Sequence, residues 1–164
     1  MNATIVIYGS STGTCEAIAE KIASKLGCDV LNVQNLTADM VAANQNLILG
    51  TSTWGAGELQ DDWYDGLKTL QDADLNGKTI ALFGCGDCST YSDTFVGGMG
   101  ELYNGIKDSG AKFIGAVETD GYTFDDSEAV IDGKFIGLPL DDINEDDKTD
   151  ARIEAWIASI NSEL

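Results

Sequence analysis

The chain has 164 residues, 43% of them hydrophobic, and its 28 Asp and Glu against 9 Lys and Arg give a formal net charge of −19. This length suffices for one sizeable core and no linker divides it, so we expect a single domain over residues 1–164. The charge excludes nucleic-acid binding, which needs a basic surface. The absence of His excludes Ser-His-Asp and Cys-His catalysis and His-based metal sites.

The first residues pass directly into an apolar run, with no basic segment before it and no cleavage site behind it. No stretch approaches the roughly 20 apolar residues that a membrane-spanning helix needs. We therefore expect a cytoplasmic protein that does not bind membranes. Its acidity favours basic protein partners, which long-range attraction would steer toward it.

Apolar runs too continuous for half-exposed strands alternate with segments of helical periodicity. Strands are predicted at 4–8, 29–33, 46–51, 79–84 and 112–117. Helices are predicted after the first strand up to Gly27, near 37–43, around 63–70, around 95–106, and at the carboxyl end of the chain along the stripe Ile153, Trp156, Ile157 and Ile160, with Thr149 or Asp147 as its cap. This alternation predicts a doubly wound α/β fold with helices on both faces of a five-stranded parallel sheet.

The segment 119–142 does not fit a minimal five-strand fold. We interpret it as an excursion that splits the fifth strand, which would resume near 135–138. Tyr122, Phe124 and Phe135 lie in or next to this excursion, and we expect them to anchor it to the body of the protein.

Three loops follow the first, third and fourth strands, and in a doubly wound sheet such loops meet at one edge. The first, 9–16, offers hydroxyls and the N-H groups of a helix N-terminus, which bind anions such as phosphate. The second, 51–59, places Trp54 among hydroxyls and glycines, and the third, 84–93, carries Tyr91. Two rings and an anion site together predict a receptor for a phosphorylated planar ring.

The sequence resembles the flavodoxins over essentially its whole length, and their long-chain subgroup because of the excursion. The motifs are Ser10, Thr12 and Gly13 with Cys15 in place of the last Thr, then Thr53-Trp54 followed by 57–60, and Gly86-Asp87 with 91–93. The resemblance implies the strand order 2-1-3-4-5. It also implies FMN as cofactor, held by Ser10, Ser11, Thr12, Gly13, Thr14, Cys15, Ser52, Thr53, Trp54, Gly55, Ala56, Gly57, Cys85, Gly86, Asp87, Tyr91 and Asp93.

The resemblance further implies a monomeric, low-potential one-electron carrier rather than an enzyme, without catalytic residues or metal ligands. It would work between the semiquinone and hydroquinone of the flavin and pass electrons to basic redox proteins. The peptide between Gly55 and Ala56 would offer its carbonyl to N5 of the reduced flavin. Glu58, Asp61, Asp62 and Asp65 are candidate contacts for partners.

Cys15 departs from the family motif, because a thiol donates more weakly than the hydroxyl expected there. At a helix N-terminus its pKa would ordinarily be lowered, although a bound phosphate would oppose ionisation. Cys85 and Cys88 form a Cys-x-x-Cys pair. A thioredoxin-like role finds no support, because that motif opens a helix after the first strand of its unit. A four-thiolate metal site finds none either, because Cys28 belongs near the far end of the first helix. A reversible disulfide in the absence of FMN stays a hypothesis.

Three other functions stay open. An FMN-dependent NAD(P)H reductase of the same fold would need a substrate pocket over the flavin, where Trp54 and Tyr91 are expected to lie. A phosphoacceptor receiver would need acidic residues after the first strand, where the chain has Gly9-Ser10-Ser11. A flavodoxin-like activator of another enzyme is the third.

Overall fold

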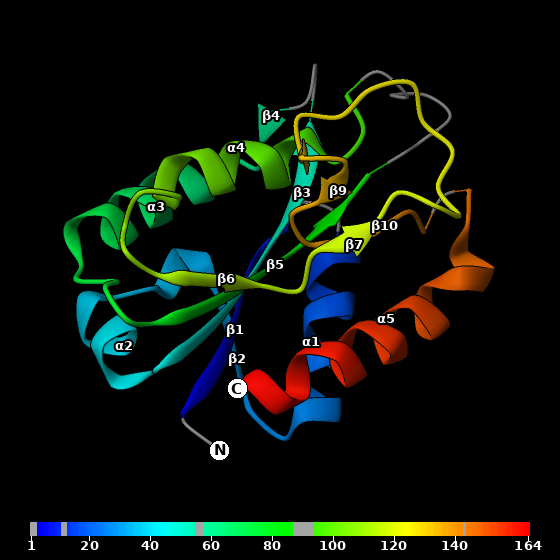
Figure 1. Cartoon of the computed structure of the whole chain (residues 1–164). Coiled ribbons are helices and arrows are strands. Elements are labelled where there is room, and N and C mark those ends of the chain that lie inside the picture. The colour runs from blue at the N-terminus through cyan, green and yellow to red at the C-terminus, as the bar shows by residue number, and fades with distance from the viewer. Residues whose placement is uncertain (1–2, 11–12, 55–57, 87–93, 143) are drawn as a thin grey trace.

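The structure is a computed structural model that describes residues 3–10, 13–54, 58–86, 94–142 and 144–164. Strands and helices alternate along the chain, as predicted, and build a largely parallel sheet between two layers of helices (Figure 1). The strands of this sheet are β1 (Thr4–Gly9), β2 (Asp29–Asn32), β3 (Asn46–Trp54), β4 (Glu58–Leu59), β5 (Thr79–Cys85), β6 (Lys112–Ile114) and β10 (Leu138–Leu140). The helices are α1 (Thr14–Leu26), α2 (Ala38–Ala43), α3 (Trp63–Asp72), α4 (Gly97–Ile106) and α5 (Asp146–Ile160).

The order of the parallel strands confirms the predicted winding. β1 pairs with β2 on one side and β3 on the other, and β5 lies beyond β3. The fifth position is shared, because β6 pairs with Thr79–Ala81 of β5 and β10 pairs with Phe83–Cys85. The order is therefore 2-1-3-4-5 with a split fifth strand.

Side chains on successive strand residues enter two different cores, because strand side chains alternate between faces. Ile5 and Ile7 face the layer of α2, α3 and α4, whereas Val6 and Tyr8 face α1 and α5. Figure 1 shows these two layers on opposite sides of the sheet. Both faces of the central strands are thus covered, which explains why their sequences read as continuous apolar runs.

The excursion between β6 and β10 carries a small antiparallel sheet that the sequence did not predict. It consists of β7 (Val117–Glu118), β8 (Val130–Ile131) and β9 (Lys134–Phe135), with β9 in the middle. The fifth strand was predicted to resume near 135–138, and it resumes at the end of that range. Phe135 belongs to β9, and β10 begins at Leu138. Gly137 lies between them and passes so close to β5 that an added Cβ would stand 2.1 Å from the Leu82 oxygen.

Aromatic side chains anchor the excursion, as expected. Phe124 and Phe135 lie 5.8 and 6.0 Å, centroid to centroid, from the buried ring of Phe95, which precedes α4. Tyr122 packs on Phe135 at 5.2 Å, and the Arg152 guanidinium of α5 covers the Tyr122 ring at 4.0 Å. The excursion is therefore held against α4 and α5 by rings and one cation.

Two helix boundaries differ from the sequence prediction. α5 begins at Asp146, so the predicted cap at Thr149 or Asp147 was wrong. Glu145 takes the capping position, but its side chain makes no capping hydrogen bond to the helix backbone. Thr149 instead donates from Oγ1 to Asp142 Oδ1 at 2.5 Å. Phe95, placed in the predicted fourth helix, lies before it. None of the helices in the described part of the chain is long and apolar enough to cross a bilayer.

Candidate functional site

The three predicted loops begin side by side at the carboxyl edge of the sheet. Gly9, the last residue of β1, is in register with Thr51 of β3, and Thr51 is in register with Gly84 of β5. One step further, Ser52 is paired with Cys85. This edge lies at the winding switch between β1 and β3, where doubly wound proteins bind their ligands.

The first loop leads into the N-terminus of α1 through a glycine in the left-handed conformation. Gly13 has φ 90° and ψ −10°, and its N-H donates to Ser10 Oγ at 3.0 Å. An added Cβ at Gly13 would meet no heavy atom of the described residues within 4 Å, so they leave the space beside the helix end open. The first N-H groups of α1 have no intrahelical acceptor, and the helix dipole makes this end positive. The arrangement is a cradle for an anion.

Cys15 lies in this helix end, but its thiol contacts Cys85 at the end of β5. Cys15 is fully buried and Cys85 is 8% exposed. Contact with Cys85, followed by burial, raises the pKa of the Cys15 thiol well above its usual range. The lowering expected for a thiol at a helix N-terminus is thus outweighed, because the side chain points into the core. No local sequence pattern indicates that these two thiols meet.

Cys28 behaves as predicted, since it follows Gly27 at the opposite end of α1. It is partly exposed, and burial raises its pKa. Among the described residues no group of three or more His, Cys, Asp or Glu side chains could hold a metal ion.

The second loop belongs to a short hairpin that ends β3. β3 continues to Trp54 and pairs antiparallel with β4, so that Thr53 faces Leu59 and Trp54 faces Glu58. The buried Thr51 accepts at Oγ1 from the Gln60 N-H at 3.3 Å, which closes the base of the hairpin. The sequence predicted a single strand here, because two-residue β4 is too short to leave an alternation pattern.

Trp63 packs beneath this edge, where two strand residues that lie against buried rings are glycines. Its Nε1 donates to the Gly50 oxygen at 2.7 Å, and an added Cβ at Gly9 would stand 2.6 Å from Trp63 Cδ1. Gly50 faces the Phe83 ring, where an added Cβ would lie 2.0 Å from Cζ. Large buried rings thus fix the strand ends that lead into the loops.

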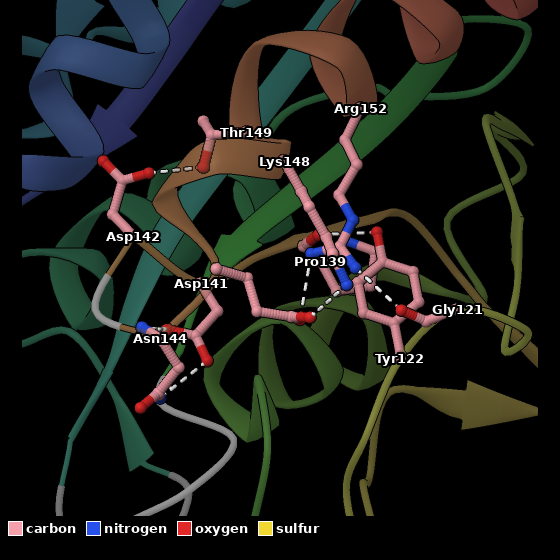
Figure 2. Close-up of polar contacts among 10 residues, drawn as sticks. Gly121, Tyr122, Pro139, Asp141, Asp142, Asn144, Lys148, Thr149 and Arg152 are labelled. Carbon is pink, nitrogen blue, oxygen red and sulfur yellow. Dashed lines mark hydrogen bonds and ion pairs between the residues drawn. The ribbon is translucent and has the colours of Figure 1, made fainter.

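A polar network fixes the neighbouring end of β10 (Figure 2). Gly86 N donates to the Leu140 oxygen at 2.9 Å, and the buried Asp141 accepts from Asn144 N and Nδ2, both at 2.9 Å. Glu145 accepts from Lys148 at 2.9 Å and from Arg152 at 3.1 Å. These cations, Lys148 first, lower the pKa of Glu145. The sequence does not indicate this network, because its acidic residues look like those of a solvated turn.

Tyr122 joins the same network from the excursion. Its hydroxyl donates to the Pro139 oxygen of β10 at 2.8 Å, and Arg152 Nη2 donates to the Gly121 oxygen at 2.9 Å (Figure 2). Burial raises the Tyr122 pKa to about 12. The excursion thus braces the strand that ends next to the third loop.

Of the predicted site residues, the structure places Gly13, Thr14, Ser52, Thr53 and Gly86 at this one edge of the sheet, with Ser10, Cys15, Trp54 and Cys85 described above. The others lie outside the described residues: Ser11, Thr12, Gly55, Ala56, Gly57, Asp87, Tyr91 and Asp93.

A doubly wound sheet with an anion cradle at its switch point defines a nucleotide-binding α/β protein, and comparison with known proteins narrows this class. The flavodoxin family model matches residues 6–156. Flavodoxin 1 of Azotobacter vinelandii is 47% identical over 166 residues, which cover 97% of this chain and 95% of that protein. A flavodoxin of Nostoc sp. strain PCC 7120 is 44% identical over 162 residues, with the same two coverages.

Solved structures support the same family. The crystal structure of Fusobacterium nucleatum flavodoxin bound to flavin mononucleotide has a TM-score of 0.94 and 34% identity, and the match covers 100% of this chain and 99% of that one. The chain belongs to the flavodoxin family. Flavodoxins are electron-transfer proteins rather than enzymes, so the reductase alternative is not favoured.

The residues present fit a flavin mononucleotide. The open space at Gly13 beside the α1 N-terminus suits its phosphate. The ends of β3 and β5 lie in register beside that cradle and lead into the loops that carry Trp54 and Tyr91 in the sequence.

Proposed function

We propose that this flavodoxin binds one FMN non-covalently at the carboxyl edge of its sheet and carries single electrons between redox proteins. The observation that carries the proposal is the Gly13 cradle at the α1 N-terminus. The strand that leads into it, β1, ends in register with β3 and β5, from which the two other loops start. Bound FMN would supply the redox chemistry, and the protein would set its potentials. The whole chain would act as one monomeric FMN-binding domain.

Within this site the phosphate would be held by the segment 10–15. Thr14 and Cys15 would contribute backbone N-H groups at the positive end of α1, which the left-handed Gly13 precedes. The Gly13 N-H itself donates to Ser10 Oγ. The Cys15 thiol contacts Cys85 and is fully buried, so we assign it to packing between the two loops instead of to phosphate binding. Ser10, Ser11 and Thr12 would supply the hydroxyl donors.

The flavin ring would lie against the other two loops. The residues proposed for it are Ser52, Thr53, Trp54, Gly55, Ala56 and Gly57 from the second loop, and Cys85, Gly86, Asp87, Tyr91 and Asp93 from the third. The ring would stack between Trp54 and Tyr91 in a chain of net charge −19. These surroundings would disfavour the negative charge that the second electron adds to the flavin, so the fully reduced flavin would be a strong reductant.

Basic redox proteins are the proposed partners. Asp61 and Asp65 are exposed beside the β3–β4 hairpin, and Tyr64 between them is 46% exposed. Carboxylates next to the proposed flavin would attract a basic reductase or acceptor and orient it, in contacts that salt weakens. We place the protein in the cytoplasm, a proposal supported by the free thiols of Cys15, Cys28 and Cys85.

The test is a titration of the FMN-free protein with FMN, followed by quenching of flavin fluorescence. We expect saturation at one FMN per chain. Riboflavin, which lacks the phosphate, is the matched control and should bind much more weakly, and inorganic phosphate should restore part of its affinity. Equal affinity for FMN and riboflavin would contradict the phosphate cradle, and failure of FMN to bind would contradict the proposed function.

A further inference from the structure

Helix α4 contacts both strands of the β3–β4 hairpin within a single turn. The Gly98 N-H donates to Thr53 Oγ1 at 3.1 Å, and the Glu101 carboxylate accepts from the Leu59 N-H at 2.7 Å. Thr53 and Leu59 are register partners across the hairpin. Gly98 and Glu101 are three residues apart, so they lie on the same face of the helix. One helix turn therefore holds each member of one cross-strand pair.

The Glu101 contact satisfies a backbone donor that the hairpin itself leaves unpaired. Among the described residues β4 pairs with β3 alone, and the Leu59 N-H finds its acceptor outside that ladder, on Glu101. A partly buried carboxylate at 2.7 Å forms a charge-assisted hydrogen bond, which is stronger than a neutral one. Leu59 itself is 1% exposed, so water cannot easily replace Glu101.

α4 is a firm support for this contact. Met99 and Leu102, on either side of Glu101, are fully buried in the core. The helix is entered through Val96, a buried residue with φ 45°. A β-branched residue rarely adopts this conformation, and it persists only where the surrounding packing determines it.

We infer that Glu101 is a positioning residue for the proposed flavin site: it fixes β4, and with it the hairpin by which β3 enters the site. The inference rests on the proposed function. The connection between β3 and β4 carries the peptide whose carbonyl is expected to accept a hydrogen bond from flavin N5-H, the group formed when N5 takes up a proton with the first electron. Holding β4 therefore favours that first one-electron step.

Three variants separate the possible roles of Glu101. E101Q removes the charge but keeps an acceptor oxygen, whereas E101A removes both and suits a helix. N104A is the matched control, because Asn104 is exposed on α4 and its replacement leaves the hairpin contacts in place. The first readout is amide hydrogen exchange at Leu59, measured by NMR with and without FMN. We expect E101A to accelerate this exchange about tenfold, the scale of one lost charge-assisted hydrogen bond. E101Q, which keeps a neutral hydrogen bond, should accelerate it less than E101A, and N104A should exchange like the wild type.

The second readout is the potential of each one-electron step with FMN bound. E101A should lower the equilibrium constant of the first step about tenfold, or about 59 mV for one electron. E101Q should leave the first step unchanged, because electron and proton enter together there, and should raise the potential of the second step, which adds net charge. Unchanged Leu59 exchange or an unchanged first potential in E101A would overturn the inference. If the wild-type protein bound no FMN, the proposed function would be wrong as well.

Discussion

Two variants, G13A and G27A, test whether Gly13 belongs to the phosphate site. Both place an alanine at an end of α1, so any effect on FMN binding that is found in G13A alone comes from the phosphate cradle and not from a less stable helix. Gly13 precedes the helix with φ 90°, and Gly27 follows it with φ 68°. At either position an added Cβ meets no atom within 4 Å in the part of the chain that the structure describes. The two substitutions therefore introduce a left-handed alanine without a steric clash, one at each end of the same helix, and only Gly13 belongs to the proposed site.

The expected strain is about 1–2 kcal/mol per substitution, the usual cost of a left-handed L-residue. With FMN bound, both variants should unfold at a lower temperature, by about 2–4 °C per kcal/mol for a chain of this size. In the FMN-free G13A protein the loop can relax out of the strained conformation. Binding must then restore it, which should weaken FMN affinity by a factor of about 5–30. G27A should bind FMN like the wild type.

The assay is thermal unfolding by circular dichroism, followed by fluorescence titration of each FMN-free protein with FMN and with riboflavin. We expect the loss in G13A to appear with FMN and to be much smaller with riboflavin, which does not load the cradle. Equal FMN affinities in G13A and G27A would refute the assignment of Gly13 to phosphate binding. Equal losses with FMN and riboflavin would show that G13A disturbs the whole edge of the sheet.

Three further predictions follow from the charges and thiols. E145Q should cost about 1 kcal/mol in free energy of unfolding at pH 7. Because Lys148 lowers the Glu145 pKa in the folded state, this difference from the wild type, measured by urea unfolding, should be complete above the ordinary carboxyl pKa and should disappear as the pH falls through the lowered folded-state pKa. Replacing Asp61 and Asp65 by Asn should slow stopped-flow reduction by a basic reductase and flatten its salt dependence, and an unchanged slope would argue against this docking surface. Cys15 should resist alkylation until the protein unfolds, so mass-spectrometric labelling of its peptide under native conditions would contradict its burial.

The sheet could be predicted from the sequence because its strands are covered on both faces. Ile5 to Ile7 alternate between two apolar cores, so a continuous apolar run carries the strand signal. The split of the fifth strand was also predictable, since the excursion interrupts the alternation of strands and helices. The point of its return was not, because Phe135 is as apolar as a central strand residue but packs on the rings of Phe95 and Phe124.

The candidate site was predictable as three loops, but not in the contacts between them. The meeting of Cys15 with Cys85 depends on how α1 packs on β5, which no local pattern encodes. The hydrogen bond from Leu59 to Glu101 joins residues 42 positions apart. Glu101 stands in a helix whose stripe was recognised, yet a single acid on a helix resembles any solvated residue. Tertiary contacts of this kind emerge only when the fold is known.

The most direct test of the central proposal is an anaerobic reductive titration of the FMN-loaded protein, followed by visible absorption. We predict two separate one-electron steps, with long-wavelength absorption that rises during the first and disappears during the second. Bleaching of the flavin in a single two-electron step would contradict the proposal that this flavodoxin carries electrons one at a time.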